Sequence, residues 1–513
     1  MRRGVALVMA TAFWLVAPVA EARPDAPQPG ELPPFFDEGD VVETHDAPGG
    51  LVRVHFTRAG RHVVDLSDGD DDGVPDVVEL AGDTLVEAWV YYRDELGFRE
   101  PLSDAAGDPN GGDGRFDLYL LRFDIGANGA FRRERCGPEG CFGYAVIEAD
   151  FRRRRFPSVR DAHRIVGSHE LFHAVQAAYA GDLSVNVSEG TATWATERFD
   201  ARLDDFEGQI AGFMARPERA LDQEPTGPID GFSYGTGLLF GFLDARFPGN
   251  DFVQQLLQGS TEEAGWLPRL EVHLGDATGA AFADELAVFA RWNLATGRRR
   301  AAEGYAQAAT YPELEPRVVD LPYADEALRV FRASTRYFRA PLVAGAREDY
   351  QVALVGAEET LASLTLLGAL EDATGGLRTF VAPDPARVLE LRPAGNAVFA
   401  HAAVVNGASQ GNSARPGLCF GTPAEVDACQ SRMVHDATDM GMADGGPGDM
   451  GAGDAGAEPA RASRGGCSAA GATASWPIFA WGLAASLVPR RRPRPGEHRD
   501  DQPNERRGRK LPE

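Results

Sequence analysis

Two histidines four residues apart, His169 and His173, lie within a long segment of helical periodicity that runs from residue 159 to 179. A helix places side chains four residues apart on one face, one turn from each other. The two imidazoles can therefore share one cation, and zinc binds imidazole nitrogen while keeping a position open for water. Glu170 lies near enough to that water to serve as its general base. The pattern predicts a zinc site on this helix.

A third protein ligand is needed, and the next helical segment, residues 188–199, offers Glu189. Ser188 is the expected N-cap of this helix, which puts Glu189 in the first turn. A loop over residues 181–187 between two antiparallel helices would bring Glu189 beside the histidines. The alternative is that Glu189 is only an acid that favours a helix N-terminus. We expect His169, His173 and Glu189 to hold zinc, with water as the fourth ligand.

The segments HELFHAVQ, residues 169–176, and EGTATW, residues 189–194, resemble the gluzincin peptidases, in which an HExxH helix is followed by a glutamate on the next helix. The likeness is strongest to a group of secreted metalloproteases of myxobacteria and their relatives, and it extends over residues 60–260. It implies a zincin-like catalytic domain with Glu170 as general base. The interval between His173 and Glu189 is shorter than in thermolysin, so the details of thermolysin do not transfer.

The oxyanion formed in peptide hydrolysis needs a hydrogen-bond donor besides the metal. Gluzincin-like families often place a tyrosine on a later helix, and Tyr234 is the candidate in this chain. The alternative is a tyrosine that packs at the start of a helix. His163 precedes His169 by six residues, off its helix face, and is expected at the surface or in support of the ligands.

An acidic loop over residues 68–79 fits the twelve-position calcium-binding pattern D-x-D-x-D-G-x5-E. Carboxylates and one carbonyl from alternate positions bind the ion in such loops, and the closing glutamate binds with both oxygens. The expected calcium ligands are Asp68, Asp70, Asp72, Val74, Asp76 and Glu79. Pro75 departs from the usual β-branched residue, and the alternative is a solvated acidic turn. A looser loop over residues 108–117 is a second, weaker candidate for calcium.

Both ends of the chain carry targeting patterns. Residues 1–22 combine two arginines, an apolar run and Ala20-Glu21-Ala22, which predicts a cleaved signal peptide; an uncleaved anchor is the alternative. Near the C-terminus, Gly466-Cys467 precedes an apolar stretch, residues 469–488, and an arginine cluster, residues 490–492. This arrangement resembles the MYXO-CTERM sorting signals of myxobacterial surface proteins, which implies processing or anchoring at Cys467; a plain membrane anchor is the alternative. The protein is therefore expected to be secreted, and to be associated with the cell surface or outer membrane.

Five cysteines fit an oxidising compartment, and two close pairs predict local disulfides, Cys136 with Cys141 and Cys419 with Cys429. A metal site at the first pair is the alternative. The net charge of -26 argues against nucleic acid as a partner, because a phosphate-binding surface must be basic. Contact with a membrane is expected only through the C-terminal segment before processing.

The hydrophobic periodicity and the turn residues of the sequence predict an α+β protein. A zincin-like domain with a mixed sheet and active-site helices is expected first, followed by a small β-rich domain. Residues 23–50 are expected to be a flexible leader, and residues 431–463 a disordered spacer. The zincin-like domain is assigned to residues 51–315, the β-rich domain to 316–430 and the sorting segment to 464–513. Helices are expected at 77–98, 159–179, 188–199, 203–214, 233–247 and 279–296, and strands at 51–56, 116–123 and 144–149.

These observations predict a zinc-dependent endopeptidase that acts on a peptide or protein substrate. The rival hypothesis is a calcium-stabilised surface-binding protein in which the peptidase-like site is inactive.

Overall fold

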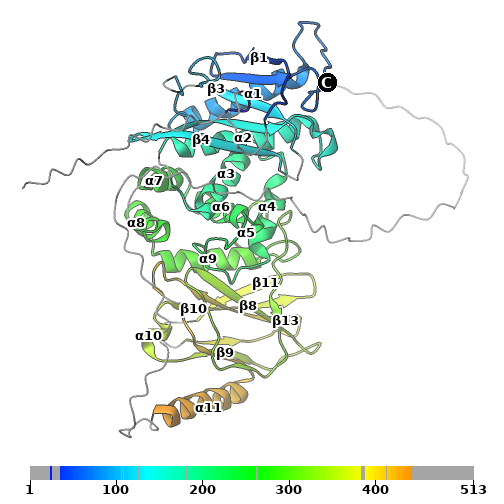
Figure 1. The fold of residues 1–513 in the computed structure, drawn as a ribbon. Helices are drawn as coiled ribbons and strands as arrows, with labels where there is room; N and C mark the ends of the chain where they lie inside the picture. Colours follow the sequence, from blue (N-terminus) through cyan, green and yellow to red (C-terminus); the bar gives the residue numbers. More distant parts are fainter. Residues whose placement is uncertain are drawn as a thin grey trace, which may run out of the picture.

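The computed structural model describes residues 23–25, 35–105, 107, 109–123, 127–179, 182–260, 264–382, 387–411 and 413–441. Within these residues the protein is α+β, as the sequence predicts. Figure 1 shows a sheet with two helices at one end of the molecule, further helices in the middle and a β-rich region at the other end.

The N-terminal sheet has the strand order β1-β2-β3-β5-β4, in which β2, β3 and β5 are parallel and the two outer strands are antiparallel to their neighbours. Every residue of β3 is buried, as expected of a strand covered on both faces. The elements of this region are β1 (Val42–Asp46), β2 (Val52–Thr57), α1 (Asp76–Val90), a π-helical turn (Tyr91–Glu95), β3 (Phe116–Leu121), β4 (Gly129–Gly137), β5 (Gly140–Glu148), a short 3-10 turn (Phe151–Arg153) and α2 (Val159–Ala177).

Alternate residues of the strands point to opposite faces of this sheet. On one face, Val54, Leu118 and Ile147 join the main core with apolar residues of α1 and α2. On the other face, Tyr119 and Val146 belong to a smaller cluster. The two helices therefore cover one face of the sheet, and α2 carries the predicted active-site motif.

The prediction of a flexible leader is wrong for part of residues 23–50. Residues 42–46 form β1, which pairs with β2 in antiparallel register, and Arg23 is fully buried. The acidic, Pro- and Gly-rich composition suggested a leader, but each residue from 42 to 46 has a partner in β2. The folded region thus begins before Leu51.

The middle of the molecule is helical, and it adds two helices that periodicity did not reveal, α7 and α8. Its elements are α3 (Val185–Phe199), α4 (Asp205–Met214), α5 (Gly231–Gly235), α6 (Gly237–Arg246), α7 (Phe252–Gln258), α8 (Trp266–Thr278) and α9 (Phe282–Leu294). The expected helix at 233–247 is divided at Thr236 into α5 and α6.

The C-terminal region contains two sheets, with strand orders β11-β10-β13-β8-β6 and β12-β9-β14-β7. A shared apolar core lies between them. The other side of the first sheet joins the main core, where the Tyr337 hydroxyl donates to the Ala290 carbonyl of α9 at 3.0 Å. The elements are β6 (Arg317–Val318), β7 (Tyr323–Asp325), β8 (Ser334–Pro341), β9 (Tyr350–Val355), α10 (Glu358–Leu361), β10 (Leu364–Asp372), β11 (Leu377–Val381), β12 (Val388–Leu391), β13 (Ala397–Asn406), β14 (Gly417–Gly421) and α11 (Pro423–Gly441).

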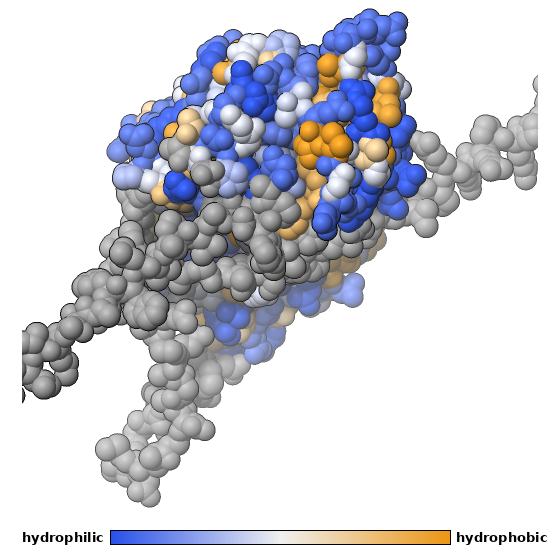
Figure 2. Space-filling view, turned by 45° about the horizontal axis from the view of Figure 1, so that its top comes forward, coloured by the Kyte–Doolittle hydropathy of each residue, from blue (hydrophilic) through white to orange (hydrophobic). Residues whose placement is uncertain are grey.

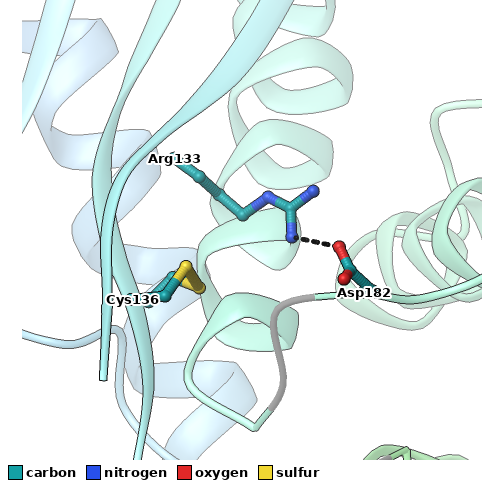
Figure 3. The surroundings of a disulfide bond; sticks show 4 residues. Arg133, Cys136 and Asp182 are labelled. Atoms are coloured by element: carbon teal, nitrogen blue, oxygen red, sulfur yellow. Dashed lines mark hydrogen bonds and ion pairs between the residues drawn. A yellow bond between two sulfur atoms is a disulfide. The ribbon is translucent and has the colours of Figure 1, made fainter. Parts of the chain in front are cut away.

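Both predicted disulfides are confirmed, with S–S distances of 2.03 Å. Cys136–Cys141 closes the β4–β5 hairpin, and beside it Arg133 and Asp182 point toward each other at 3.5 Å (Figure 3). Cys419–Cys429 joins β14 to α11, and α11 continues to Gly441. The first residues of the predicted disordered spacer are therefore helical.

The predicted signal peptide, the rest of the spacer and the sorting segment with Cys467 lie outside the described residues. Among the described helices, none has the length and apolar character needed to cross a bilayer. The face of the molecule in Figure 2 is mainly hydrophilic, in keeping with the high net charge.

Helix α1 packs closely on the sheet at Gly82. A β-carbon at this position would lie 2.9 Å from the Ala47 β-carbon and 3.2 Å from Val54 Cγ2. We expect Gly82→Leu to lower the free energy of unfolding by about 1–3 kcal/mol, because the larger side chain separates the helix from the sheet. Thermal unfolding measures the effect. Gly208→Leu in α4 is the matched control, because a β-carbon there meets nothing within 4 Å; equal melting temperatures for the two variants would contradict this packing.

Candidate metal centre

Helices α2 and α3 carry the predicted metal ligands. Helix α2 begins at Val159, after Ser158, whose hydroxyl accepts from the Asp161 N–H at 3.0 Å. Helix α3 begins at Val185, and its N-cap is Ser184, which accepts from the Val187 N–H at 3.3 Å. The prediction of Ser188 as N-cap is therefore wrong.

The earlier start of α3 bears on the role of Glu189. The helix dipole favours an acid only in the first turn of a helix. Glu189 is the fifth residue of α3 and lies beyond that turn. Its side chain is largely buried, so solvation does not stabilise the carboxylate either. The dipole alternative thus does not explain the position of Glu189, and its neighbours on α2 do.

The structure brings His169, His173 and Glu189 together, with one ligand atom of each within 4.8 Å of the others. A Glu189 carboxylate oxygen lies 3.2 Å from His169 Nε2 and 3.6 Å from His173 Nε2. Burial opposes charge on His173, but the nearby Glu189 carboxylate raises its pKa to about 9. Burial likewise opposes charge on Glu189, but the histidines, His173 first, lower its pKa to about 2.

A hydrogen-bond network fixes the orientation of His173. The Gln176 amide nitrogen donates to the Ser188 carbonyl at 2.7 Å, and a carbonyl only accepts, so the amide oxygen must face the other way. That oxygen lies 2.9 Å from His173 Nδ1, which therefore donates to it. In neutral His173 the lone pair is consequently on Nε2, the nitrogen that faces Glu189.

Glu170 lies on the side of α2 that faces strand β4. Its side chain is largely buried, and a β-carbon on Gly129 would lie 2.7 Å from Glu170 Oε1. Burial raises the pKa of Glu170, and the Glu189 carboxylate raises it further, while the two histidines lower it. Glycine at position 129 is what allows the strand to approach the carboxylate so closely.

Tyr234 lies at the same centre, on α5. Its ring is 5.9 Å from the His169 ring, and burial, followed by the charges of Glu189 and Glu170, raises its pKa well above the usual value. Two hydrogen bonds tie α5 to the start of α3: the Ser233 hydroxyl donates to Asn186 Oδ1 at 2.8 Å, and the Thr236 hydroxyl donates to the Asn186 carbonyl at 2.7 Å. Tyr234 thus lies close to the predicted ligands.

The acidic loop brings together three of its six predicted calcium ligands, Asp68, Asp70 and Asp72. Glu79 lies close to them: burial and then the Asp72 and Asp70 charges raise its pKa. Asp76 instead accepts from the Gly69 N–H at 2.8 Å. Val74, also a predicted calcium ligand, donates its N–H to Asp72 at 2.7 Å.

The looser loop before β3 does not gather free carboxylates in its described part. Asp113 forms ion pairs with Arg115 and, at 2.9 Å, with Arg53. Asp117 is buried against Arg23 and lies 2.7 Å from His55 Nε2. Arginine and histidine side chains thus pair with both of these carboxylates.

A further group, Asp37, Asp40 and His62, has the composition of a metal site. His62 Nδ1 accepts from the Arg122 N–H at 2.9 Å, so the neutral ring carries its proton on Nε2. Nε2 is the nitrogen that faces Asp37, at 3.9 Å. This group is therefore better described as a histidine–carboxylate contact than as a metal site.

Sequence reasoning assigned no role to Gln176, Ser188 or Gly129 at this centre. Gln176 follows His173 by three residues, so helical spacing alone could have placed it on the same face. Gly129 could not be found in this way, because strand β4 was not predicted and its contact with Glu170 joins distant parts of the chain.

Comparisons with known proteins give little guidance. No family model matches the chain, and no curated protein matches it. Among solved structures, a family GH115 4-O-methyl-alpha-glucuronidase with specificity for decorated arabinogalactans has 11% sequence identity and a TM-score of 0.13. The likeness covers 52% of this chain and only 30% of that enzyme. A TM-score this low carries no argument about fold or function.

His163 is buried in α2, contrary to the expectation of a surface position, and packs edge-on against Phe151 at 5.0 Å. Burial lowers its pKa from 6.5 to about 3. The folded protein therefore keeps His163 neutral, while the unfolded chain binds a proton below about pH 6.5. The resulting stability is present above pH 6.5 and is lost as the pH falls toward 3.

We expect His163→Phe to reduce the loss of stability between pH 6.5 and pH 4.5 by up to about 1.4 kcal/mol per pH unit. Chemical unfolding at a series of pH values measures this slope. His273→Phe, at a less buried position on α8, is the matched control. The same slope in wild type and His163→Phe would contradict the burial of a neutral histidine.

Proposed function

We propose that this protein is a zinc-dependent endopeptidase that hydrolyses peptide or protein substrates. The observation that carries the proposal is the convergence of two imidazole nitrogens and one carboxylate from α2 and α3, with a second carboxylate, Glu170, beside them. Two histidines and a glutamate are a known ligand set of catalytic zinc sites. The gluzincin resemblance at the same residues supports the same function.

The residues present fit zinc. The Gln176 network directs the His173 Nε2 lone pair toward Glu189, and hydrogen-bonding groups behind a ligand histidine fix its tautomer in this way in zinc sites. The Glu189 carboxylate lies close enough to both imidazoles to share one cation with them. His169, His173 and Glu189 would hold the metal.

Bound zinc supplies a Lewis acid that polarises a carbonyl and acidifies water. Glu170 would accept a proton from the attacking water and return it to the leaving amine. Tyr234 would donate a hydrogen bond to the oxygen that becomes negative during the attack. The largely buried position of Glu170 beside Gly129 limits competing contact with bulk water.

Strand β4 offers a place for an extended substrate. It lies at the edge of the described sheet, and its first residues border Glu170. An edge strand can bind an extended peptide through main-chain hydrogen bonds. This arrangement favours an endopeptidase that acts on unfolded or loop segments of protein substrates.

Secretion is part of the same proposal. The two disulfides fit an extracellular compartment, and the N-terminal and C-terminal patterns of the sequence indicate export followed by attachment at the cell surface or outer membrane.

Calcium is proposed as a second, structural metal, bound by the loop that leads into α1. Asp68, Asp70 and Asp72 gather their oxygens at one place, and Glu79 approaches from the first turn of α1. An ion bound there would offset the repulsion among these carboxylates and hold the loop against the sheet.

We expect Glu170→Gln to lower peptide cleavage by about 10²–10⁴-fold, because the variant cannot accept a proton. A fluorogenic peptide mixture measures turnover, and elemental analysis should find about one zinc per chain in both proteins. Glu87→Gln on α1, an exposed carboxylate, is the matched control. Undiminished cleavage by Glu170→Gln would refute the mechanism, and a metal-free protein that adheres to cells or polymers would favour the rival binding function.

Calcium added to chelator-treated protein at constant zinc should raise the melting temperature, by an amount equivalent to about 2.7 kcal/mol at a hundredfold excess over the dissociation constant. Asp70→Asn should weaken this response, while Asp83→Asn, exposed on α1, should keep it. A response of the same size in Asp70→Asn would show that calcium binds elsewhere.

A further inference from the structure

Arg23 is an arginine whose whole side chain is buried, and three carboxylates surround it. Glu134 accepts two hydrogen bonds from its guanidinium, at 2.7 Å and 2.6 Å. Asp104 and Asp117 form ion pairs with the two terminal nitrogens. Buried charges of this kind are costly unless each is paired, so the pocket is built for a planar cation with several donors.

The pocket holds more negative than positive charge. One guanidinium, together with the His55 ring whose Nε2 lies 2.7 Å from Asp117, faces three carboxylates that are each less than one-tenth exposed. Burial, and then the charges of Asp117 and Glu134, outweigh the effect of Arg23 and raise the pKa of Asp104 to about 7. A second positive charge near Arg23 would therefore be stabilised.

Processing would supply that charge. The predicted signal-peptide cleavage after Ala22 makes Arg23 the first residue of the mature chain. Its new α-amino group is protonated near neutral pH and belongs to the same buried residue. The pocket thus already holds the side chain of the residue that would become the N-terminus.

The pocket also connects the N-terminus to the metal centre. Glu134 lies on β4 and Asp117 on β3, with β5 between these strands in the sheet. The start of β4, at Gly129, borders Glu170. Arg23 therefore ties an edge strand to the interior of the sheet and limits the movement of the strand beside the proposed general base.

We propose that Asp104, Asp117 and Glu134 form a docking pocket for the N-terminal Arg23 of the processed chain, and that the docked arginine holds strand β4 in place beside Glu170. The effect on turnover rests on the proposed peptidase function. The docking itself does not.

Hydrogen exchange of the secreted, zinc-loaded protein tests the docking. N-terminal sequencing should give Arg23 as the first residue. In Arg23→Ala, amide exchange over residues 129–137 should become at least about tenfold faster, since the strand opens more often. Addition of millimolar L-argininamide, an arginine with a free α-amino group, should restore protection in this variant. Arg153→Ala, at a surface arginine, is the matched control.

Asp104→Asn gives the same test without a change near the cleavage site. In Asp104→Asn, amide exchange over β4 should also become faster. L-Argininamide should restore less protection in this variant than in Arg23→Ala. Turnover should fall in both variants while zinc content is unchanged. Unaltered exchange in both variants, a lack of response to L-argininamide in Arg23→Ala, or a mature chain that begins elsewhere would overturn the proposal. A wild-type protein without peptidase activity would refute the proposed function alone, because the exchange measurements would still report docking.

Discussion

The antiparallel contact between α2 and α3 is the interaction on which the proposed metal centre depends. Gln176 donates from α2 to the Ser188 carbonyl of α3, and Gly190 allows α3 to approach the α5–α6 junction so closely that a β-carbon would lie 2.2 Å from the Thr236 hydroxyl. The first contact sets the histidines opposite Glu189, and the second brings Tyr234 over His169. A bulkier residue at position 190 would displace α5 and its tyrosine. One helix pair thus positions the proposed ligands, while its neighbours position the residues that act with them.

The acidic side chains of this protein differ in the kind of group that lies beside them. Where carboxylates are buried, arginine or histidine accompanies them, as Arg23 does for Glu134 and as His401 does for Glu371 at 2.8 Å. At the metal centre the partners are two histidines, whose ring nitrogens can exchange a proton for a cation. In the loop over residues 68–79 the acids gather without such a partner among the described contacts, which is the chemistry that favours calcium. A carboxylate paired with arginine or with a single histidine thus belongs to a structural ion pair, whereas carboxylates beside two histidines or beside one another are candidate metal ligands.

The sequence predicted features that local chemistry decides. Helical spacing placed His169 and His173 on one face, and the short loop brought Glu189 to them; cysteine proximity gave both disulfides. It failed where distant segments determine the outcome. Strand β1 owes its conformation to β2, and the burial of His163 depends on Phe151 from outside its helix. Helix α3 begins at Val185, earlier than predicted, and Asn186 in its first turn donates to the distant Leu221 carbonyl at 2.9 Å. None of these three contacts leaves a periodic pattern in the sequence.

Strand β4 shows how an edge strand can be kept both open and rigid. Edge strands are prone to pair with other chains, and proteins restrain them by several means. Here the far end of β4 is joined to β5 by the Cys136–Cys141 disulfide. The first residue of β5, Gly140, rests on α2, where a β-carbon would lie 2.5 Å from the Ala177 carbonyl. Glu134 anchors its middle to Arg23. A strand fixed at these points can offer its remaining backbone groups to a substrate without moving relative to Glu170, and such prior organisation reduces the entropy lost on binding.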